Sequence, residues 1–475
     1  MRQPLGSNVS AEVLDTHHKA LNVNLTPRWY GTFAEIGAGQ EVVRWFFRVG
    51  GGAGTIAKSI SAYDMKVSDA IYGRASRYVC RERLQAMLNY EHKLNLDRLK
   101  DVRGDTTAFF AFADTVSARN FKGTNECHGW MGIKFQAYPR DEDSQIIIHV
   151  RMLDVEAALQ QEALGIVGVN LVYGAFALNH EPEMLVKSLL DGLSTSRIEI
   201  DMIEFSGIAF RQVDNRLMSL TLVELGLSGA AMFAANGEVL QPSEFFYRKP
   251  ILVERGSFRP VCNVNLDMLR CAHEKFTALP NVRGKEVAQV MEITMRNLKA
   301  GGEIDLRDFL ARADVMSACG NTVLISDYFE YYRLAAYLSR YTKEPIAITM
   351  GAASLQDLFD EKYYTQLEGG VLESFGRLFK NDLKIYCYPL MNKDSGELMT
   401  YQNLVIAPEL EKLYGYLVDR GGINGLDNYD ERCLKIFSRD VLNRIRDGDP
   451  TWEEMVPAVV AEVIKMKNYF GYQQQ

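Results

Sequence analysis

The chain has 475 residues, enough for two or three domains, and its 47% hydrophobic and 24% charged residues are typical of a globular protein with a large core. Its formal net charge of −8 argues against a general nucleic-acid binder, which carries an excess of Lys and Arg. Seven cysteines without a C-x-x-C spacing exclude a dense disulfide framework and a typical structural zinc site, so we expect reduced thiols.

The sequence also predicts where the protein resides. It contains no uninterrupted stretch of about 18 apolar residues, the length that would span a membrane. The first residues lack the apolar segment of a secretory signal. We therefore expect a cytoplasmic protein whose partners include neither a membrane nor nucleic acid.

Short apolar runs alternate with amphipathic stretches along the chain, which is the pattern of an α/β protein. Runs rich in Ile, Val, Phe and Tyr predict strands at 31–36, 108–113, 130–137, 145–152, 197–203, 230–233, 251–254, 322–325, 346–350 and 383–388. Stretches with helical periodicity predict helices at 41–48, 81–99, 155–164, 182–193, 266–278, 286–299, 306–318, 328–341 and 354–362.

The order of these elements predicts the fold class. Residues 320–350 read strand, helix, strand, which is a βαβ unit with parallel strands. We predict two Rossmann-like, mostly parallel α/β halves followed by a helical C-terminal tail. The predicted boundaries give a flexible arm at 1–20, an N-terminal α/β domain at 21–240, a nucleotidyltransferase-like α/β domain at 241–400 and the tail at 401–475.

The most informative segment for function is a strand, a glycine turn and a helix start at 248–276. The first N–H groups of a helix are unpaired and carry the positive end of its dipole, so they form a ready anion site. Arg255 and Arg259 flank the turn, Gly256 allows a close backbone approach or a positive φ, and Asn265 lies at the helix start. This arrangement predicts a phosphate cradle, with a purely structural turn as the alternative.

The run GSFRPVCNVNL in this segment resembles the nucleotide-binding signature of nicotinamide and nicotinate mononucleotide adenylyltransferases. The matching positions are Gly256, Phe258, Pro260, Val261 and Leu266. The departures are Arg259 for Asn or Asp, Cys262 for His or Thr, and Asn265 for the second His; the later Ser-Thr-Arg motif is missing. The resemblance implies nucleotide binding by Arg255, Gly256, Ser257 and Phe258, catalysis by Arg259 and Asn265, and Mg²⁺ bound with ATP. Asn265 can donate a hydrogen bond but cannot act as a cation.

The whole chain resembles a family of bacterial proteins of similar length through YGTFAEIGAGQEV, SAYDMKVSDAIYG, ECHGWMGIKFQ and YYRLAAYLSRYT. Two names are in use for that family: nicotinate-nucleotide adenylyltransferase and TonB-dependent receptor. The receptor name would require an export signal and many alternating strands, and we expect neither.

A second candidate ligand site lies at TFAEIGAGQ. Here Glu35, Gly37 and Gly39 follow a predicted strand, and Asp64 comes further along the chain. A glycine turn after a strand and a downstream acid for ribose hydroxyls are typical of dinucleotide and S-adenosylmethionine sites. The third glycine of the dinucleotide motif is absent, so a structural turn is the alternative.

A third group consists of polar residues near predicted strand ends. Asp114, His128, His149 and Arg151 together would form an acid–base or phosphate site, whereas His149 alone inside an apolar run is typical of a hydrogen-bonded core histidine. No pair of histidines has the H-x-x-x-H spacing, so we predict no metal site.

These observations support two hypotheses from different classes. The first is a cytosolic protein that binds a nucleotide or a phosphorylated small molecule, with a divergent adenylyltransferase as its enzymatic form. An enzyme that binds S-adenosylmethionine or a dinucleotide at the Gly37–Gly39 turn is a further alternative. The second is a non-enzymatic protein that self-associates, as a homo-oligomer or filament, and whose nucleotide-like loop is structural. Dense tyrosine groups at 328–332 and 361–364 are consistent with an oligomer interface, although tyrosines at the rim of the protein's own core are the favoured alternative for them. We expect a homo-oligomer in either case.

Overall fold

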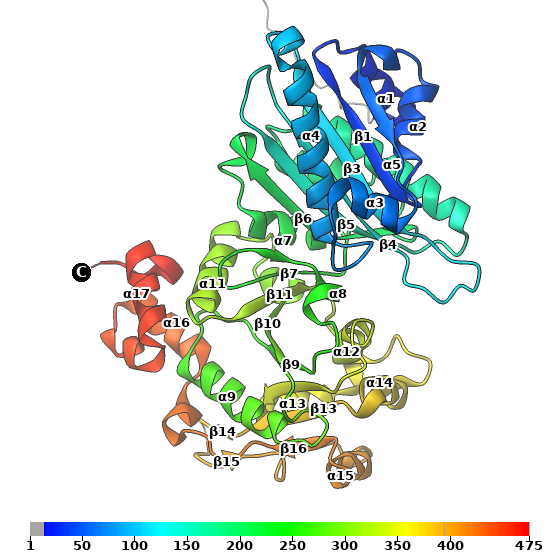
Figure 1. The fold of residues 1–475 in the computed structure, drawn as a ribbon. Coiled ribbons are helices and arrows are strands. Elements are labelled where there is room, and N and C mark those ends of the chain that lie inside the picture. Colours follow the sequence, from blue (N-terminus) through cyan, green and yellow to red (C-terminus); the bar gives the residue numbers. More distant parts are fainter. Residues whose placement is uncertain (1–13, 394, 475) are drawn as a thin grey trace, which may run out of the picture. The chain divides into compact units, whose positions relative to one another are not determined.

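The structure, a computed structural model, describes residues 14–393 and 395–474. They form two compact units, one ending at Ser228 and one beginning at Gly229 (Figure 1). This division precedes the predicted boundary after residue 240, because β7 (Ala230–Phe233) pairs with a strand of the second unit. None of the helices in the described residues is long and apolar enough to cross a membrane.

The first unit is built on a six-stranded sheet in the order β2-β1-β3-β4-β5-β6. Its central strand β1 is parallel to β2 and β3, whereas the pairs from β3 to β6 are antiparallel. The parallel part of this sheet is therefore confined to three strands. The strands are β1 (Trp29–Gly37), β2 (Ile56–Ile60), β3 (Ala108–Ser117), β4 (His128–Phe135), β5 (Ser144–Met152) and β6 (Ile198–Gly207).

Helices cover both faces of this sheet. The helix α4 (Arg81–Arg103) contacts β1, β3 and β4 on one face, and α5 (Ala157–Ala177) contacts β4 and β5 from the other, where the large core cluster lies. The α5 sequence is apolar almost all round, as expected for a buried helix. The remaining helices are α1 (Thr16–Leu25), α2 (Val42–Arg48), α3 (Met65–Tyr72), α6 (Pro182–Ser188) and α7 (Asn215–Glu224).

The predicted N-terminal arm at 1–20 overlaps a packed helix. The helix α1 begins at Thr16, its N-cap Asp15 accepts from the backbone N–H of His18, and its residues Lys19 and Ala20 are buried. The Nζ of Lys19 donates to Oδ1 of Asn170 at 2.9 Å, which anchors α1 to α5. Residues 1–13 lie outside the described residues.

The second unit contains an eight-stranded sheet in the order β16-β13-β12-β9-β10-β11-β7-β8. The strands from β16 to β11 are parallel, and β7 and β8 extend the sheet in antiparallel fashion. In chain order the parallel strands are arranged 3-2-1-4-5-6, which is the order of the Rossmann fold. They are β9 (Ile251–Arg255), β10 (Ala288–Thr294), β11 (Thr322–Ser326), β12 (Ile346–Gly351), β13 (Lys384–Tyr388) and β16 (Ile423–Gly425), with β8 at Val239–Leu240.

One predicted element is wrong. Residues 286–299 were expected to form a helix, but they contain β10 and only the short helix α10 (Met295–Leu298). β10 lies between β9 and β11 in the centre of the sheet and is buried on both faces except at Gln289. A strand covered on both sides reads as a continuous apolar run, which period alone does not separate from a buried helix.

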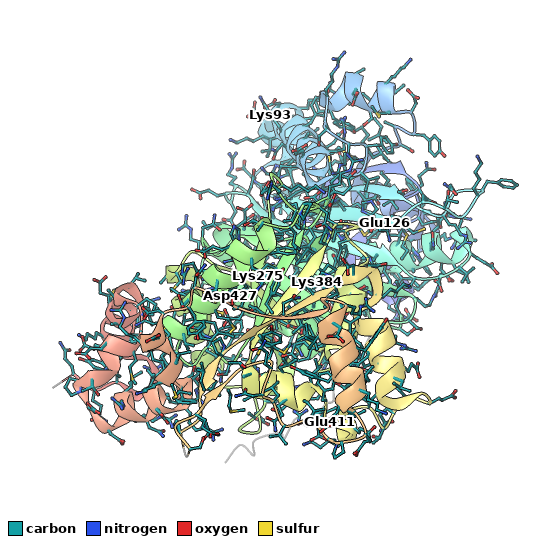
Figure 2. The ribbon with its side chains drawn as sticks, turned by 90° about the horizontal axis from the view of Figure 1, so that it is seen from below. Lys93, Glu126, Lys275, Lys384, Glu411 and Asp427 are labelled. Carbon is teal, nitrogen blue, oxygen red and sulfur yellow. The ribbon has the colours of Figure 1, made fainter. Side chains whose placement is uncertain are left out.

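Helices again cover both faces of the second sheet. The core cluster of this unit lies between the sheet and α12 (Tyr331–Leu338), α13 (Ala352–Leu358) and α14 (Gly370–Leu378). The helix α9 (Asn263–Thr277) contacts β9 and β12 but contributes no residue to that cluster, so it covers the other face. On α9, Lys275 pairs with Asp427 at 2.9 Å and ties the helix to the segment after β16 (Figure 2).

The C-terminal region is helical, as predicted, but it is not separate from the sheet. It contains α15 (Glu411–Asp419), α16 (Ser438–Asp447) and α17 (Ala458–Lys467), and it supplies β16 to the sheet edge. The helix α17 packs against α11 (Leu306–Ala318). The predicted class, mixed α/β with two α/β halves and a helical C-terminal region, is confirmed. The remaining elements are α8 (Pro242–Phe245), β14 (Leu390–Met391) and β15 (Leu398–Met399).

Candidate functional site

The second unit has a cavity of about 350 Å³ at the carboxyl ends of β9, β10 and β11. In the order 3-2-1-4-5-6 the chain reverses direction across the sheet between β9 and β12, and ligands of open α/β folds bind in the crevice at that point. The cavity wall is formed by the ends of these strands and the residues that follow them, together with α13 and the segment after it. It comprises Arg255, Gly256, Ser257, Thr294, Arg296, Asn297, Phe329, Glu330, Tyr331, Ser354, Asp357, Leu358, Tyr363 and Tyr364.

A buried ion pair forms the base of this cavity. Arg255, the last residue of β9, places Nε 2.8 Å and Nη2 2.9 Å from the two carboxylate oxygens of Glu292 on β10. The same guanidinium donates to the backbone oxygens of Tyr328 (2.7 Å) and Phe329 in the loop after β11. Its planar face covers the ring of Tyr331 at 4.3 Å. Arg255 therefore joins three strand ends through these contacts. It also lines the cavity, and its role as a phosphate ligand stays a prediction.

Arg296 is the cation that the cavity presents to solvent. Its guanidinium carbon lies 3.8 Å from the ring centre of Phe329 and 6.0 Å from that of Tyr363. The side chain is exposed, and no described carboxylate lies within ion-pair distance. A guanidinium stacked on aromatic rings keeps its N–H edge available, and that edge fits a phosphate or carboxylate. Arg296 was not singled out from the sequence, because it lies inside the helix predicted at 286–299.

Hydrogen bonds fix the turn that follows β9. Asn297 donates its side-chain amide to the backbone oxygen of Gly256 at 3.3 Å, and Arg312 on α11 donates to the oxygen of Ser257 at 3.2 Å. A Cβ at Gly256 would lie 2.8 Å from the ring of Phe258, so glycine is required for close packing. The positive φ, 47°, falls on Phe258 and not on Gly256. Gly256 and Ser257 line the cavity, whereas Phe258 is buried.

The cavity wall also carries two carboxylates and several hydroxyl groups. Glu330 and Asp357 lie on this wall, and Glu330 is also 3.4 Å from Arg333. Burial raises the pKa of the Tyr331 hydroxyl, which therefore stays protonated. Carboxylates accept hydrogen bonds from ligand hydroxyls or amines, and Arg296 donates to anions. The arrangement suits a ligand that carries both an anionic group and hydroxyl groups.

The helix start predicted as the phosphate cradle is occupied by the protein itself. Asn265 accepts from the backbone N–H of Cys262 at 2.9 Å in a capping box and donates to Oε1 of Glu254 at 2.7 Å. Asn263 donates to the backbone oxygen of Glu454 at 3.0 Å, and Sγ of Cys262 lies 3.6 Å from Oγ of Ser438. The C-terminal region thus covers the N-terminus of α9, and Asn265 serves as a helix cap.

Arg259, the other predicted catalytic residue, is also engaged away from the cavity. Its Nε lies 2.6 Å from Oδ1 of Asp308 on α11, and Asp308 accepts from Arg312 at 2.7 Å. Neither Arg259 nor Asn265 belongs to the cavity wall. The structure therefore gives both residues packing roles where the sequence predicted catalysis.

The acids of the second predicted site, in the first unit, cap helices. Glu35 accepts from the backbone N–H groups of Val42 (2.9 Å) and Val43 (3.2 Å) at the start of α2. Asp64 accepts from Lys66 (2.9 Å) and Val67 at the start of α3. Glu35 is buried and uses both carboxylate oxygens in its cap, whereas Asp64 is exposed and uses only Oδ1.

The two glycines of that site are required by close packing. Gly37 has φ 74°, and a Cβ there would lie 2.2 Å from the backbone oxygen of Val116. A Cβ at Gly39 would lie 2.1 Å from Oδ1 of Asp114. Glycine at both positions lets the turn cross the end of β3.

Asp114 is buried beside Glu35 on the parallel strands β3 and β1. Burial raises the pKa of Glu35 to about 8, although its helix-cap hydrogen bonds oppose the rise. Burial and the neighbouring Glu35 raise the pKa of Asp114 well above its ordinary value. Neither carboxylate oxygen of Asp114 has a hydrogen-bond partner among the described residues. Burial therefore favours the protonated forms of both acids.

The third predicted group is assembled in part. Nδ1 of His149 lies 2.6 Å from the buried carboxylate of Asp201, and Nε2 of His149 lies 3.0 Å from Nδ1 of His128. Burial and His149 lower the pKa of His128 to about 4, so this ring is neutral at pH 7. Arg151 pairs with Glu199 at 2.7 Å, and Asp114 lies on the opposite face of the sheet. Asp201, which completes the chain of hydrogen bonds, was not singled out from the sequence because it follows an isoleucine-rich strand start without a motif.

One group of described side chains has the donor types of a metal site. Asp15, His17 and His18 at the start of α1 bring ligand atoms within 4.8 Å of one another. All three are exposed, and Asp15 also caps α1. We interpret them as a surface cap.

The comparisons with known proteins do not identify a family. No model of a known protein family matches the chain, and no curated protein matches it. Thus the resemblance to adenylyltransferases is not confirmed.

Solved structures that match part of the chain include three from bacteria. The competence/damage inducible protein CihA from Agrobacterium tumefaciens is 14% identical, with the match covering 37% of this chain and 96% of that chain at a TM-score of 0.25. A competence-damaged protein (CinA) superfamily protein from Enterobacter cloacae is 11% identical, and the match covers 37% of this chain and 98% of that chain at a TM-score of 0.25. One from Klebsiella pneumoniae is 16% identical, and the match covers 34% of this chain and 95% of that chain at a TM-score of 0.23. Likeness at this level carries no argument about function, so the fold assignment rests on the strand order itself.

Proposed function

We propose that the second unit binds a nucleotide or another phosphorylated small molecule in the cavity at the carboxyl ends of β9, β10 and β11. The observation that carries this proposal is the position of the cavity at the reversal of a 3-2-1-4-5-6 strand order, with Arg296 stacked on Phe329 at its edge. Fold alone does not determine function, so the chemistry of the cavity wall has to support the ligand class.

The cavity wall supplies each contact that such a ligand needs. Arg296 would bind the phosphate through its free N–H edge. The rings of Phe329 and Tyr363, 5.4 Å apart, would pack against a planar base or a sugar face. Asp357 and Glu330 would accept hydrogen bonds from ligand hydroxyls.

The charge of the wall restricts the ligand further. Two carboxylates stand near one exposed cation, so a ligand with several phosphates would be repelled unless Mg²⁺ neutralised part of its charge. A monophosphate would need only Arg296. We therefore propose that a mononucleotide such as NMN binds without a metal ion, whereas ATP requires Mg²⁺, held by its phosphates together with Asp357 or Glu330.

The proposal concerns binding and does not include adenylyl transfer by Arg259 and Asn265. Their contacts to Asp308 and Glu254 support structural roles. We expect Arg259→Ala to leave ligand affinity unchanged while lowering stability.

Thermal unfolding with NMN, NAD, ATP and ATP with Mg²⁺ tests the proposal. A ligand at 100 times its Kd stabilises the folded state by about 2.7 kcal/mol, which a melting curve resolves. Arg296→Ala should weaken binding by about tenfold or more, the value of a charge-assisted hydrogen bond. The matched control is Arg307→Ala, an exposed arginine outside the cavity wall.

Two outcomes would contradict the proposal. One is the absence of a midpoint shift with all four ligands. The other is equal loss of affinity in Arg296→Ala and Arg307→Ala, which would indicate that general surface charge, and not this cavity, attracts the ligand.

A further inference from the structure

The first unit contains a second cavity in the corresponding position of its own sheet. This cavity, of about 690 Å³, lies outside the carboxyl ends of β1 and β3, and its wall includes Gly37, Ala38, Val116 and Ser117 from the ends of these strands. After β1 the chain forms β2 on one side and then returns to form β3 on the other, so strand order reverses at β1. Crevices at such reversal points are where open α/β sheets bind ligands.

Several hydrogen bonds hold the wall of this cavity in place. The backbone N–H of Ala38 donates to the oxygen of Val116 at 3.2 Å, which fixes the glycine turn on the end of β3. The Tyr78 hydroxyl donates to the backbone oxygen of Tyr63 at 2.7 Å, and Thr115 donates to the backbone oxygen of Tyr78 at 2.7 Å. The loop after β2 is thereby joined to β3. A wall fixed in this way needs little ordering when a ligand enters.

The charge on the wall of this cavity is of one sign. Arg119 is the only charged side chain among its lining residues, and it is exposed with no described carboxylate within ion-pair distance. The apolar part comes from Val79 and Val116 and from Tyr63 and Met65, whose side chains are 73% and 50% exposed. Large exposed apolar side chains beside a cavity are typical of a ligand site.

The acids that dinucleotide and S-adenosylmethionine sites use for ribose hydroxyls are missing from this wall. Glu35 and Asp64 cap α2 and α3 and do not line the cavity. A cavity with one cation, no carboxylate and an apolar side favours a compact organic anion over a nucleotide with its ribose hydroxyls.

We propose that the cavity of the first unit binds a small organic anion, with Arg119 holding its phosphate or carboxylate and with Tyr63, Met65 and Val116 contacting its apolar body. This site is separate from the one proposed in the second unit and uses none of its residues. Arg119 directly follows the end of β3, in the same position relative to its strand as Arg296 has relative to β10.

Isothermal titration of the full chain with phenyl phosphate and with benzoate tests this site, and benzylamine and benzyl alcohol serve as cationic and neutral controls. We expect at least one of the two anions to bind and neither control to bind comparably. Binding of phenyl phosphate alone would identify a phosphate ester as the ligand class, and binding of benzoate alone would identify a carboxylate.

Arg119→Ala should weaken anion binding by about tenfold or more. Lys122→Ala, an exposed cation of the same loop outside the wall, should leave it unchanged. The proposal is overturned if neither anion binds at millimolar concentration, if the amine or alcohol binds as well as the anions, or if Lys122→Ala has the same effect as Arg119→Ala. Binding that persists in Arg119→Ala and is lost only in Arg296→Ala would also overturn it, because the anion would then occupy the cavity of the second unit.

Discussion

Glu254 offers a quantitative test of the packing around α9. Its carboxyl group is buried in β9, Oε1 accepts from Asn265 at 2.7 Å, and Oε2 has no hydrogen-bond partner among the described residues. Burial raises the pKa of Glu254 from 4.5 to about 8, and the Asn265 hydrogen bond offsets only part of that rise. The folded protein therefore retains a proton that the unfolded chain releases above pH 4.5.

The sign of the pH dependence follows from this difference. Because the folded state binds more protons than the unfolded state between pH 4.5 and 8, the contribution of Glu254 to the free energy of unfolding falls as pH rises through this window. The slope is about 1.4 kcal/mol per pH unit, which gives at most about 5 kcal/mol across the window. The full contribution is present below pH 4.5 and is lost once the pH exceeds 8.

The variant Glu254→Gln removes the titration and keeps an oxygen for Asn265. At pH 5 we expect it to be less stable than the wild type, because its amide N–H groups replace a protonated carboxyl group in a buried space. As pH rises to 8, the unfolding free energy of the variant should increase relative to that of the wild type by about 1.4 kcal/mol per pH unit. Urea unfolding of both proteins at pH 5, 6, 7 and 8 measures this shift.

The matched control is Glu303→Gln, which changes an exposed carboxylate. Its stability difference from the wild type should be nearly constant over the same pH range. Parallel curves for wild type and Glu254→Gln would refute the reasoning, because they would mean that Glu254 titrates at the same pH in the folded and unfolded chains.

Three further predictions concern stability. Arg255→Met should lower the unfolding free energy measured in urea by about 3–5 kcal/mol, because it leaves the Glu292 carboxylate buried without its cation. Glu292→Gln in the same chain should recover part of this loss, and no recovery would argue against the ion pair as the cause. Gly39→Ala should lower the unfolding free energy by about 1–3 kcal/mol, because its Cβ would clash with Asp114. Asp114→Ala in the same chain should relieve this clash, so additive losses in the double variant would contradict the contact. Asn265→Ala should lower the thermal midpoint through a loss of about 1–2 kcal/mol, whereas an unchanged midpoint would show that the cap contributes little.

The sequence predicted the fold well where strands and helices have distinct patterns. The strand, turn and helix from Ile251 to Thr277 and the βαβ unit at 320–350 appear where expected, because each joins a β-branched apolar run to an amphipathic stretch. β10 was mistaken for part of a helix because a strand buried on both faces has no alternation. β2 at Ile56–Ile60 was missed because this half-buried edge strand has a weak apolar pattern.

The candidate site was predictable only in part. Gly256 and Ser257 were found because a glycine turn after a strand is a recognisable local signal. Arg296 was not found, since its position at the cavity depends on stacking against Phe329, which is distant in sequence. The contacts of Asn265 were predictable only in part: its position at the helix start is visible in the sequence, but its hydrogen bond to Glu254 across the turn is not.

The contacts of Arg255 restrict what evolution and protein design can place at this position. One planar group bonds simultaneously to a carboxylate on a neighbouring strand and to two carbonyl oxygens of a loop that contacts the cavity. A lysine carries its three N–H donors on a single nitrogen, which cannot occupy the separate positions of Nε, Nη1 and Nη2, so it could not reproduce all of these hydrogen bonds. Substitution by lysine would therefore keep the charge but increase the mobility of the loop. A ligand of the proposed kind would then bind more weakly, because its binding would have to order the loop.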